Sequence, residues 1–255
     1  MGYYQNGIPL GYKAVAARLA EDIEPPDLSL PDRWQKLMDG NPWLRKKINR
    51  RRRVIEHCRY VADWLPELAT YPRGIVVDVG PGLGELLEIA GYFGHEPIGV
   101  DAKEGKGGMG DDYLAACRIM HEWRGLNVVY CGLSEFLREA NGWPEMEGNV
   151  VAINMRGSIE QCFAHLLDGP PHHEHHRADR LVWRDKDEVA EAFDEMFRVY
   201  AKWLRDHGVV LIHANGTGTP ESQSLYQWAL QTCASKNGLE LLLSSGGRLH
   251  KFSKP

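Results

Sequence analysis

The sequence has no apolar stretch of membrane-spanning length, so it offers no candidate for a transmembrane helix. Its first residues have neither a basic start nor an apolar run, and no secretory signal peptide is expected there. The five cysteines lie far apart and include no C-x-x-C pair, which is not the spacing of a zinc site or a disulfide framework. We therefore expect reduced thiols in a cytoplasmic protein that does not associate with membranes.

The sequence also has no excess of positive charge: the 255 residues have a net charge of −5. A surface that attracts nucleic acid everywhere is thus not expected. The composition, with 43% hydrophobic and 25% charged residues, is ordinary for a globular protein. The length allows a full hydrophobic core, and one catalytic domain with an N-terminal appendage is the simplest division.

A glycine-rich turn after an apolar strand is the most informative feature that is present. Residues 76–84 read VVDVGPGLG, and a second strand at 97–101 ends on Asp101. A dinucleotide site favours G-x-G-x-x-G, which brings helix N–H groups to a pyrophosphate. Here the third glycine comes one residue early, and Asp78 precedes the first glycine by two residues. A carboxylate at that place suits a ligand with an ammonium and a sulfonium better than it suits a pyrophosphate.

With strand, turn, helix and second strand in this order, the chain resembles the class I S-adenosylmethionine-dependent methyltransferases. The resemblance covers roughly residues 70–255, whereas residues 1–40 match nothing known to us. It implies an α/β, Rossmann-like fold with a seven-stranded, mostly parallel sheet, an antiparallel last strand and helices on both faces. It also implies S-adenosyl-L-methionine as the cofactor and S-adenosyl-L-homocysteine as its product. We expect a helical appendage over residues 1–70 and the cofactor-binding domain over residues 71–255.

The spacing of apolar residues predicts the secondary structure in more detail. One amphipathic helix is expected over residues 42–65, with Asn41 as N-cap and Pro42 in the first turn. Arg51 falls on the apolar stripe of this helix, so it must be paired or turned outward. Other helices are expected at 13–21, 84–93, 111–123, 186–205 and 220–236. Strands are expected at 74–79, 97–101, 128–131, 150–154, 209–213, 239–244 and 248–252.

The resemblance also assigns the cofactor-binding residues. Asp78 would neutralise the amino group of the cofactor, and Asp101 would accept hydrogen bonds from both ribose hydroxyls, for which a carboxylate has the capacity. The backbone that approaches the cofactor would come from Gly80, Pro81, Gly82, Gly84 and Ala102.

The remaining cofactor contacts are expected after the third and fourth strands. The adenine pocket should lie near Leu133 and Ser134, where many relatives have an acidic residue at the position of Leu133. Ser134 could meet the adenine amine or only cap the following helix. Asn154 should face the methionine end of the cofactor and the acceptor.

Two residues at strand ends are candidates for the chemistry, because ligands bind outside the carboxyl ends of such strands. His213 could be a general base, since an imidazole titrates near neutral pH, or it could simply bond to neighbouring backbone. Arg156 could anchor a carboxylate or phosphate of the acceptor, or form a surface ion pair. The N-P-P-Y-type motif of enzymes that methylate amino groups of nucleic acids is absent.

A histidine-rich segment, residues 169–176, falls between the fourth and fifth strands. Adjacent histidines usually point in different directions, and magnesium prefers oxygen ligands, so we expect no metal there. An insertion over about residues 165–187 is expected to form a polar lid over the acceptor site instead. A second glycine-rich loop, residues 103–110, could close over the site as well.

Seven basic side chains lie within residues 45–53 of this acidic protein. Most are expected on the solvated sides of a helix, but the patch could also contact RNA phosphates. The leading hypothesis is a methyltransferase acting on a small-molecule or sugar-type acceptor, most simply at oxygen. The alternatives are an RNA methyltransferase that uses the basic helix, and a cofactor-binding scaffold without catalysis.

Overall fold

The computed structural model describes residues 4–5, 8–23, 29–103, 109–156, 186–213, 220–245 and 249–255. They belong to two compact units, Met1–Val129 and Tyr130–Pro255. The histidine-rich segment and nearly all of the expected lid at 165–187 lie outside the described residues, as does most of the loop at 103–110. The expected domain boundary at residue 70 stays a prediction.

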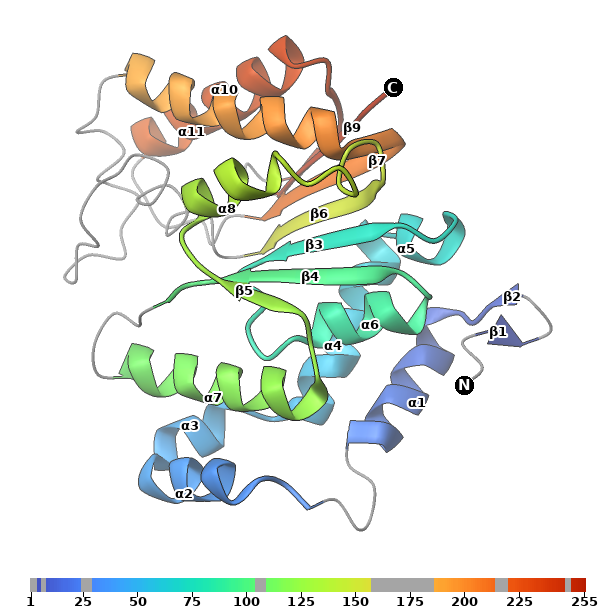
Figure 1. Ribbon diagram of the computed structural model, residues 1–255, viewed down its shortest axis with the longest axis vertical. Coiled ribbons are helices and arrows are strands. Elements are labelled where there is room, and N and C mark those ends of the chain that lie inside the picture. The colour runs from blue at the N-terminus through green and yellow to red at the C-terminus, as the bar shows by residue number, and fades with distance from the viewer. Residues whose placement is uncertain are drawn as a thin grey trace. The chain divides into compact units, whose positions relative to one another are not determined.

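The first unit begins with a short hairpin and five helices, and then alternates strands and helices. Its elements are β1 (Tyr4–Gln5), β2 (Ile8–Pro9), α1 (Tyr12–Ile23), α2 (Asp32–Gly40), α3 (Pro42–Lys47), α4 (Arg50–Trp64), α5 (Glu67–Thr70), β3 (Ile75–Val79), α6 (Glu85–Tyr92), β4 (Glu96–Asp101) and α7 (Met109–Arg124), followed by β5 (Val128–Tyr130) at its end. Within this unit α6 packs on β3 and β4, α4 packs on α6, and α1 packs on α4 (Figure 1).

The second unit continues the alternation. Its elements are α8 (Leu133–Ala140), β6 (Val150–Arg156), α10 (Lys186–Trp203), β7 (Leu204–His213), α11 (Pro220–Lys236), β8 (Glu240–Ser245) and β9 (Leu249–Ser253). The helices α10 and α11 lie side by side. Aromatic rings of α10 form much of the core, with Phe197 5.4 Å from Phe252 of β9 and Phe193 5.9 Å from Tyr226 of α11 between ring centroids.

The sheet confirms the expected fold class. Its seven strands follow the order β5-β4-β3-β6-β7-β9-β8. The pairs β3–β4 and β6–β7 are parallel, whereas β9 is antiparallel to both of its neighbours, β7 and β8. The last strand, β9, therefore lies between β7 and β8 and runs antiparallel to both. Parallel strands of this kind end at one edge of the sheet, which is where ligands of open α/β sheets bind.

The single helix expected over residues 42–65 is wrong, because the chain breaks between α3 and α4. The Asn49 side chain accepts a hydrogen bond from the backbone N–H of Arg52, at 3.0 Å, and so starts a new helix. Pro42 does begin α3, but Asn41 makes no side-chain cap there and instead donates to the Leu37 carbonyl, at 3.1 Å. A local cap therefore overrides the continuous apolar spacing.

The break also changes which face of α4 is buried. Its buried residues are Arg50, Val54, Cys58, Tyr60 and Val61. By contrast, Ile55 is 42% exposed, and Arg51 is exposed as well. The apolar stripe expected through Arg51 and Ile55 is thus shifted by one residue, and the arginine that α4 buries is Arg50.

The N-terminal helices α2 and α3 pack against the glycine turn. Trp34 and Met38 of α2, Leu44 of α3 and Met120 of α7 form one buried cluster with Leu83, which stands between two glycines of the turn. Leu83 is fully buried in this cluster. The appendage is therefore part of the packing that holds the turn in place.

Candidate active site

The three glycines of the turn all have a backbone conformation that other residues rarely adopt. The φ angles of Gly80, Gly82 and Gly84 are 73°, 60° and 90°. Glycine adopts positive φ without a steric penalty, which explains why it stands at each of these positions. The Gly80 N–H donates to the Val100 carbonyl at 2.8 Å, so the turn is joined to the end of β4.

Three side chains lie close to the middle of the turn. A Cβ atom on Gly82 would lie 3.2 Å from Nη2 of Arg53 and 3.3 Å from Oη of Tyr113. The ring Nε2 of His121 lies 2.8 Å from the Gly82 carbonyl oxygen. Burial lowers the pKa of His121, so the imidazole is neutral at neutral pH and donates from Nε2 to that carbonyl. The turn is therefore held by α4 and α7 as well as by β4.

Arg53 reaches the turn as the partner of a buried glutamate at the start of α6. Its Nε donates to Oε1 of Glu85 in a short contact, and its Nη2 lies 3.5 Å from Oε2. Glu85 is fully buried. Burial alone would raise the pKa of Glu85, but His57 and Arg53 outweigh it and hold the pKa below its ordinary value. The pair is thus ionised, and the guanidinium has a fixed position beside Gly82.

A second arginine of α4 forms an equivalent pair one turn away. Nη2 of Arg50 lies 3.1 Å from Oε1 of Glu88, and Nε of Arg124 lies 3.1 Å from the same oxygen. The two arginines of α4 are three residues apart, as are the two glutamates of α6. The earlier arginine pairs with the later glutamate, so the helices run antiparallel along the contact. Buried ion pairs therefore fasten the appendage to the helix that follows the turn.

The two acidic residues expected to bind the cofactor lie on neighbouring strands of this unit. Asp78 is 3% exposed near the end of β3, and its register partner on β4 is Gly99. Asp101 ends β4, and its Oδ1 accepts the N–H of Ala102 at 2.9 Å. Burial raises the pKa of Asp101 from its ordinary value of 3.8 to about 6, against the opposing effects of the Ala102 N–H and of Arg118. A carboxylate with so little solvation would gain from two hydroxyl donors, so it fits a ribose.

The expected catalytic pair lies in the second unit, at the ends of two neighbouring parallel strands. Arg156 of β6 and His213 of β7 are register partners, as are Asn154 and Leu211 two residues earlier. Paired positions on adjacent strands point to the same face of a sheet, so Asn154, Arg156 and His213 share one face. Asn154 is 2% exposed, whereas Arg156 and His213 are partly exposed. The structure thus brings these three sequence candidates together.

The residues expected near adenine begin α8. Leu133 is buried as the first residue of this helix, and Ser134 follows it in the first turn. The expected capping role of Ser134 is wrong, because the N-cap position is Gly132 and no side-chain cap is formed. A role for either residue at adenine stays a prediction.

Arg53 and Glu85 were missed as site residues by the sequence reasoning. Arg53 was counted with the solvated basic run, and Glu85 was not considered. The signal that could have found them is the matched spacing of Arg50 and Arg53 with Glu85 and Glu88. Without knowing that α4 and α6 are neighbours, this spacing has no special meaning.

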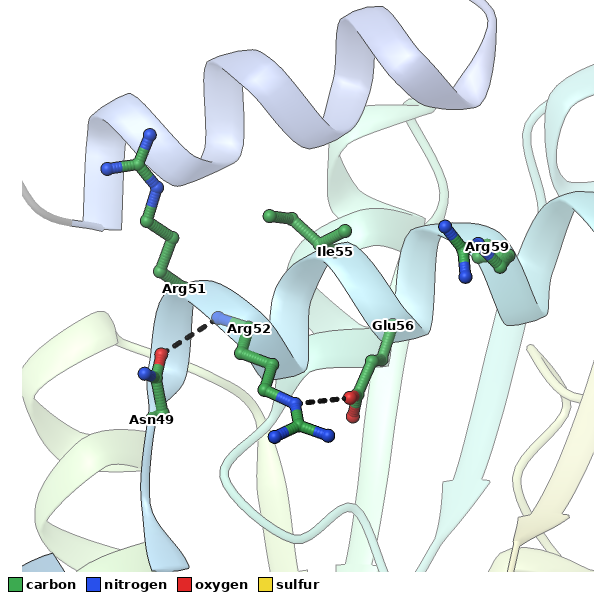
Figure 2. Close-up of a pocket in the computed structure, with 6 residues that line it drawn as sticks. All are labelled: Asn49, Arg51, Arg52, Ile55, Glu56 and Arg59. Atoms are coloured by element: carbon green, nitrogen blue, oxygen red, sulfur yellow. Dashed lines mark hydrogen bonds and ion pairs between the residues drawn. The ribbon is translucent and has the colours of Figure 1, made fainter. Parts of the chain in front are cut away.

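The outer face of α4 carries a shallow groove of about 380 Å³. Figure 2 shows the residues that line it, with Arg52 bonded to Asn49 and Glu56 and with Arg51 extended toward α1. Its lining residues are Asn49, Arg51, Arg52, Ile55, Glu56 and Arg59. Arg53, which contacts the glycine turn, is not among them. The groove is therefore a surface distinct from the turn.

Within the described ranges of the chain, no group of three or more histidine, cysteine, aspartate or glutamate side chains is placed to hold a metal ion. The histidines of residues 169–176 lie outside those ranges. A search of the helices in the same ranges finds none with the length and apolar character needed to cross a membrane.

The solved structures similar to this chain include several methyltransferases. A SAM-dependent methyltransferase from Archaeoglobus fulgidus is 16% identical, over 71% of this chain and 67% of that one, with a TM-score of 0.42. The antibiotic-resistance methyltransferase Kmr is 16% identical over 76% and 91%, with a TM-score of 0.39. A Galdieria sulphuraria protein with a provisional assignment as a sarcosine dimethylglycine methyltransferase is 15% identical, with a TM-score of 0.40. The match covers 74% of this chain and 65% of the Galdieria protein, just under two thirds of its length.

No protein-family model matches the sequence, and no curated protein matches it either. The three structural similarities are distant and give no information about the acceptor.

Proposed function

We propose that the protein is an S-adenosylmethionine-dependent methyltransferase that acts on a small-molecule or sugar-type acceptor at oxygen. The observation that carries the proposal is the turn of Gly80, Gly82 and Gly84, joined by a backbone hydrogen bond to the strand that ends at Asp101. Asp78 would hold the amino group of the cofactor and Asp101 its ribose. When bound, the cofactor supplies a methyl group on a positively charged sulfur.

Methyl transfer to a hydroxyl is a displacement in which a C–O bond forms and a C–S bond breaks. The hydroxyl proton must leave, and in this proposal His213 accepts it as a general base. Arg156, the register partner of His213, holds an anionic group of the acceptor. The remaining task is alignment of the reacting groups, which rigid strand ends perform well.

The pairing of the basic residues favours a small acceptor over RNA. Four of the seven basic side chains in residues 45–53 form ion pairs within the chain, namely Arg45 with Asp39, Arg50 with Glu88, Arg52 with Glu56 and Arg53 with Glu85. An arginine already paired with a carboxylate gains less from a phosphate. The groove on the outer face of α4 is the one observation that keeps RNA as a second candidate.

The test is to supply methyl-labelled S-adenosylmethionine to the protein together with separated RNA and small-molecule extracts of its host. Label in a low-mass fraction supports the proposal and identifies the product. Label in a nuclease-sensitive polymer overturns the proposed acceptor. Cofactor binding with no label in either fraction favours the scaffold hypothesis and contradicts a small soluble acceptor.

RNA as acceptor has its own discriminating variant. Arg51→Ser combined with Arg59→Ser removes two exposed charges of the groove without touching the buried pairs. If RNA is the acceptor, this variant loses RNA binding and methylation of RNA while S-adenosylhomocysteine affinity stays the same. Replacing all of residues 50–53 would instead confuse RNA contacts with the loss of the Arg50–Glu88 and Arg53–Glu85 pairs.

A further inference from the structure

The ion pair with Glu85 does not explain why the Arg53 guanidinium is partly exposed beside the glycine turn. Its side chain is 24% exposed, whereas that of Glu85 is fully buried. Nη2 of Arg53 would stand 3.2 Å from a Cβ atom on Gly82, in the middle of the glycine turn. The guanidinium thus borders both the turn and solvent, which is where a ligand of the turn would lie.

Glu85 positions this guanidinium without using all of its donors. The short contact is made by Nε, and the distance from Nη2 to Oε2 is 3.5 Å, at the limit of a hydrogen bond. A guanidinium carries five N–H donors in a rigid fork. The edge formed by Nη1 and Nη2 therefore has donors left for a planar carboxylate, which arginine binds through two parallel hydrogen bonds.

The charges around the turn match one chemical group. A buried carboxylate, Asp78, precedes the turn by two residues, and a fixed guanidinium, Arg53, stands beside its middle glycine. An α-amino acid group carries an ammonium and a carboxylate on one carbon. We propose that Arg53, held by Glu85, binds the α-carboxylate of the cofactor's amino acid part. This inference rests on the proposed function, since it assumes that the ligand of the turn is S-adenosylmethionine.

The competing explanation is that Arg53 only stabilises the contact between α4 and α6. Arg50 provides the comparison within the same helix, because it forms the same kind of pair with Glu88. The side chains of Arg50 and Glu88 are 7% and 9% exposed, and Arg50 has the ring of Trp123 beside it. Arg50 therefore has the burial of a structural arginine, and Arg53 differs from it in facing the turn.

The test measures binding of two probes by titration calorimetry: S-adenosylhomocysteine, and its analogue that lacks the α-carboxylate. If Arg53 binds the carboxylate, the wild-type protein binds the analogue roughly 10- to 100-fold more weakly than S-adenosylhomocysteine, as expected for hydrogen bonds to a charged group. Arg53→Met should lose most of this difference, because its affinity for S-adenosylhomocysteine falls to that for the analogue. Arg53→Lys should recover only part of it, since an ammonium lacks the planar fork.

Loss of Arg53 leaves Glu85 buried without its partner, so Arg53→Met could fold poorly. Arg53→Met combined with Glu85→Met removes both charges and keeps the volume, which is tolerated far better than removal of one partner. Arg50→Met is the matched control, because Glu88 keeps Arg124 as a partner. The control should discriminate between the two probes as strongly as the wild type does.

The outcomes separate this inference from the proposed function. If the wild-type protein binds neither probe, the proposed function fails and the role of Arg53 fails with it. If the wild type binds both probes equally, or if the double variant still prefers S-adenosylhomocysteine as the wild type does, only the role of Arg53 is overturned. Loss of the preference in the double variant and not in Arg50→Met supports it.

Discussion

Nη2 of Arg50 lies 3.1 Å from Oε1 of Glu88, and both side chains are more than nine-tenths buried. We expect Arg50→Met to destabilise the protein by about 1–3 kcal/mol, since Glu88 loses one of its two buried partners and keeps only Arg124. Chemical denaturation measures this. Arg51→Ser on the exposed side of α4 is the control and should change stability by less than about 0.5 kcal/mol. Equal effects of the two substitutions would contradict the assignment of Arg50 to the core.

Asp101 is expected to reduce the stability of the ligand-free protein. Burial raises its pKa in the folded state to about 6, above the ordinary value of 3.8. Stability of the ligand-free protein should therefore fall as pH rises from about 4 to about 6, and Asp101→Asn should raise it by about 1–2 kcal/mol at pH 7. The same variant should lose affinity for S-adenosylhomocysteine at least about tenfold. Thermal melts with and without the ligand measure both effects, and a variant that is less stable without ligand would argue against the buried charge.

Cofactor affinity should depend on pH through the same carboxyl group. If the ionised form of Asp101 accepts the ribose hydroxyls, as in the proposed function, affinity for S-adenosylhomocysteine should fall about tenfold between about pH 8 and about pH 5. Calorimetric titrations across this range give the profile. The Asp101→Asn variant should bind weakly at every pH with a flatter profile. A wild-type affinity that is constant down to about pH 5 would show that Asp101 does not bind as a carboxylate.

Gly84 should not accept a side chain, because its φ is 90° and a Cβ atom there would overlap Cδ1 of Leu126. Gly84→Ala is expected to destabilise the protein by about 1–3 kcal/mol and to weaken binding of S-adenosylhomocysteine. Gly91, in the same stretch of chain, would have nothing within 4 Å of such a Cβ atom. Because it lies within α6, Gly91→Ala should be neutral or stabilising by up to about 1 kcal/mol. Urea denaturation of both variants compares them directly.

The base role of His213 predicts a selective kinetic defect. His213→Asn should lower kcat for methylation of a hydroxyl by roughly 100-fold or more, with little change in cofactor affinity. His207→Asn is a matched control, because His207 lies in the same strand, is exposed, and has a positive φ that asparagine tolerates. Steady-state kinetics with each purified variant decide the matter. A His213→Asn enzyme with full kcat would remove the proposed base.

The parts of the fold that could be predicted from the sequence are those in which local signals agree. The β-branched run before Gly80 and the alternation of strands and helices from residue 74 onward have a regular pattern. The observed strands follow it, except that β7 begins at Leu204 and not at the expected residue 209. The α3–α4 break was missed because the single Asn49 side chain caps a new helix within an apolar spacing that continues through it. The sequence alone does not say whether the cap at Asn49 or the continuous apolar spacing decides where the helix begins. The packing of α4 shows that the cap does.

The candidate site also has residues that the sequence predicts and residues that only the packing reveals. Asp78 and the three glycines belong to one continuous motif, and Asp101 ends the following strand, so the sequence alone predicts them as one site. Arg53 was not, because its role depends on the packing of α4 against α6, which the spacing of charges does not reveal by itself. For the same reason, the sequence could not tell that Arg50 is buried and Arg51 exposed.

The burial of Leu83 among Trp34, Met38 and Leu44 makes the glycine turn share its stability with helices about forty residues earlier in the chain. Unfolding of α2 and α3 would remove the side chains that pack against Leu83. Partial unfolding of these helices is therefore expected to release a ligand bound by the turn. A ligand held by the turn must then slow amide hydrogen exchange in α2 and α3, which it need not touch. The N-terminal helices and the glycine turn would then behave as one cooperative folding unit.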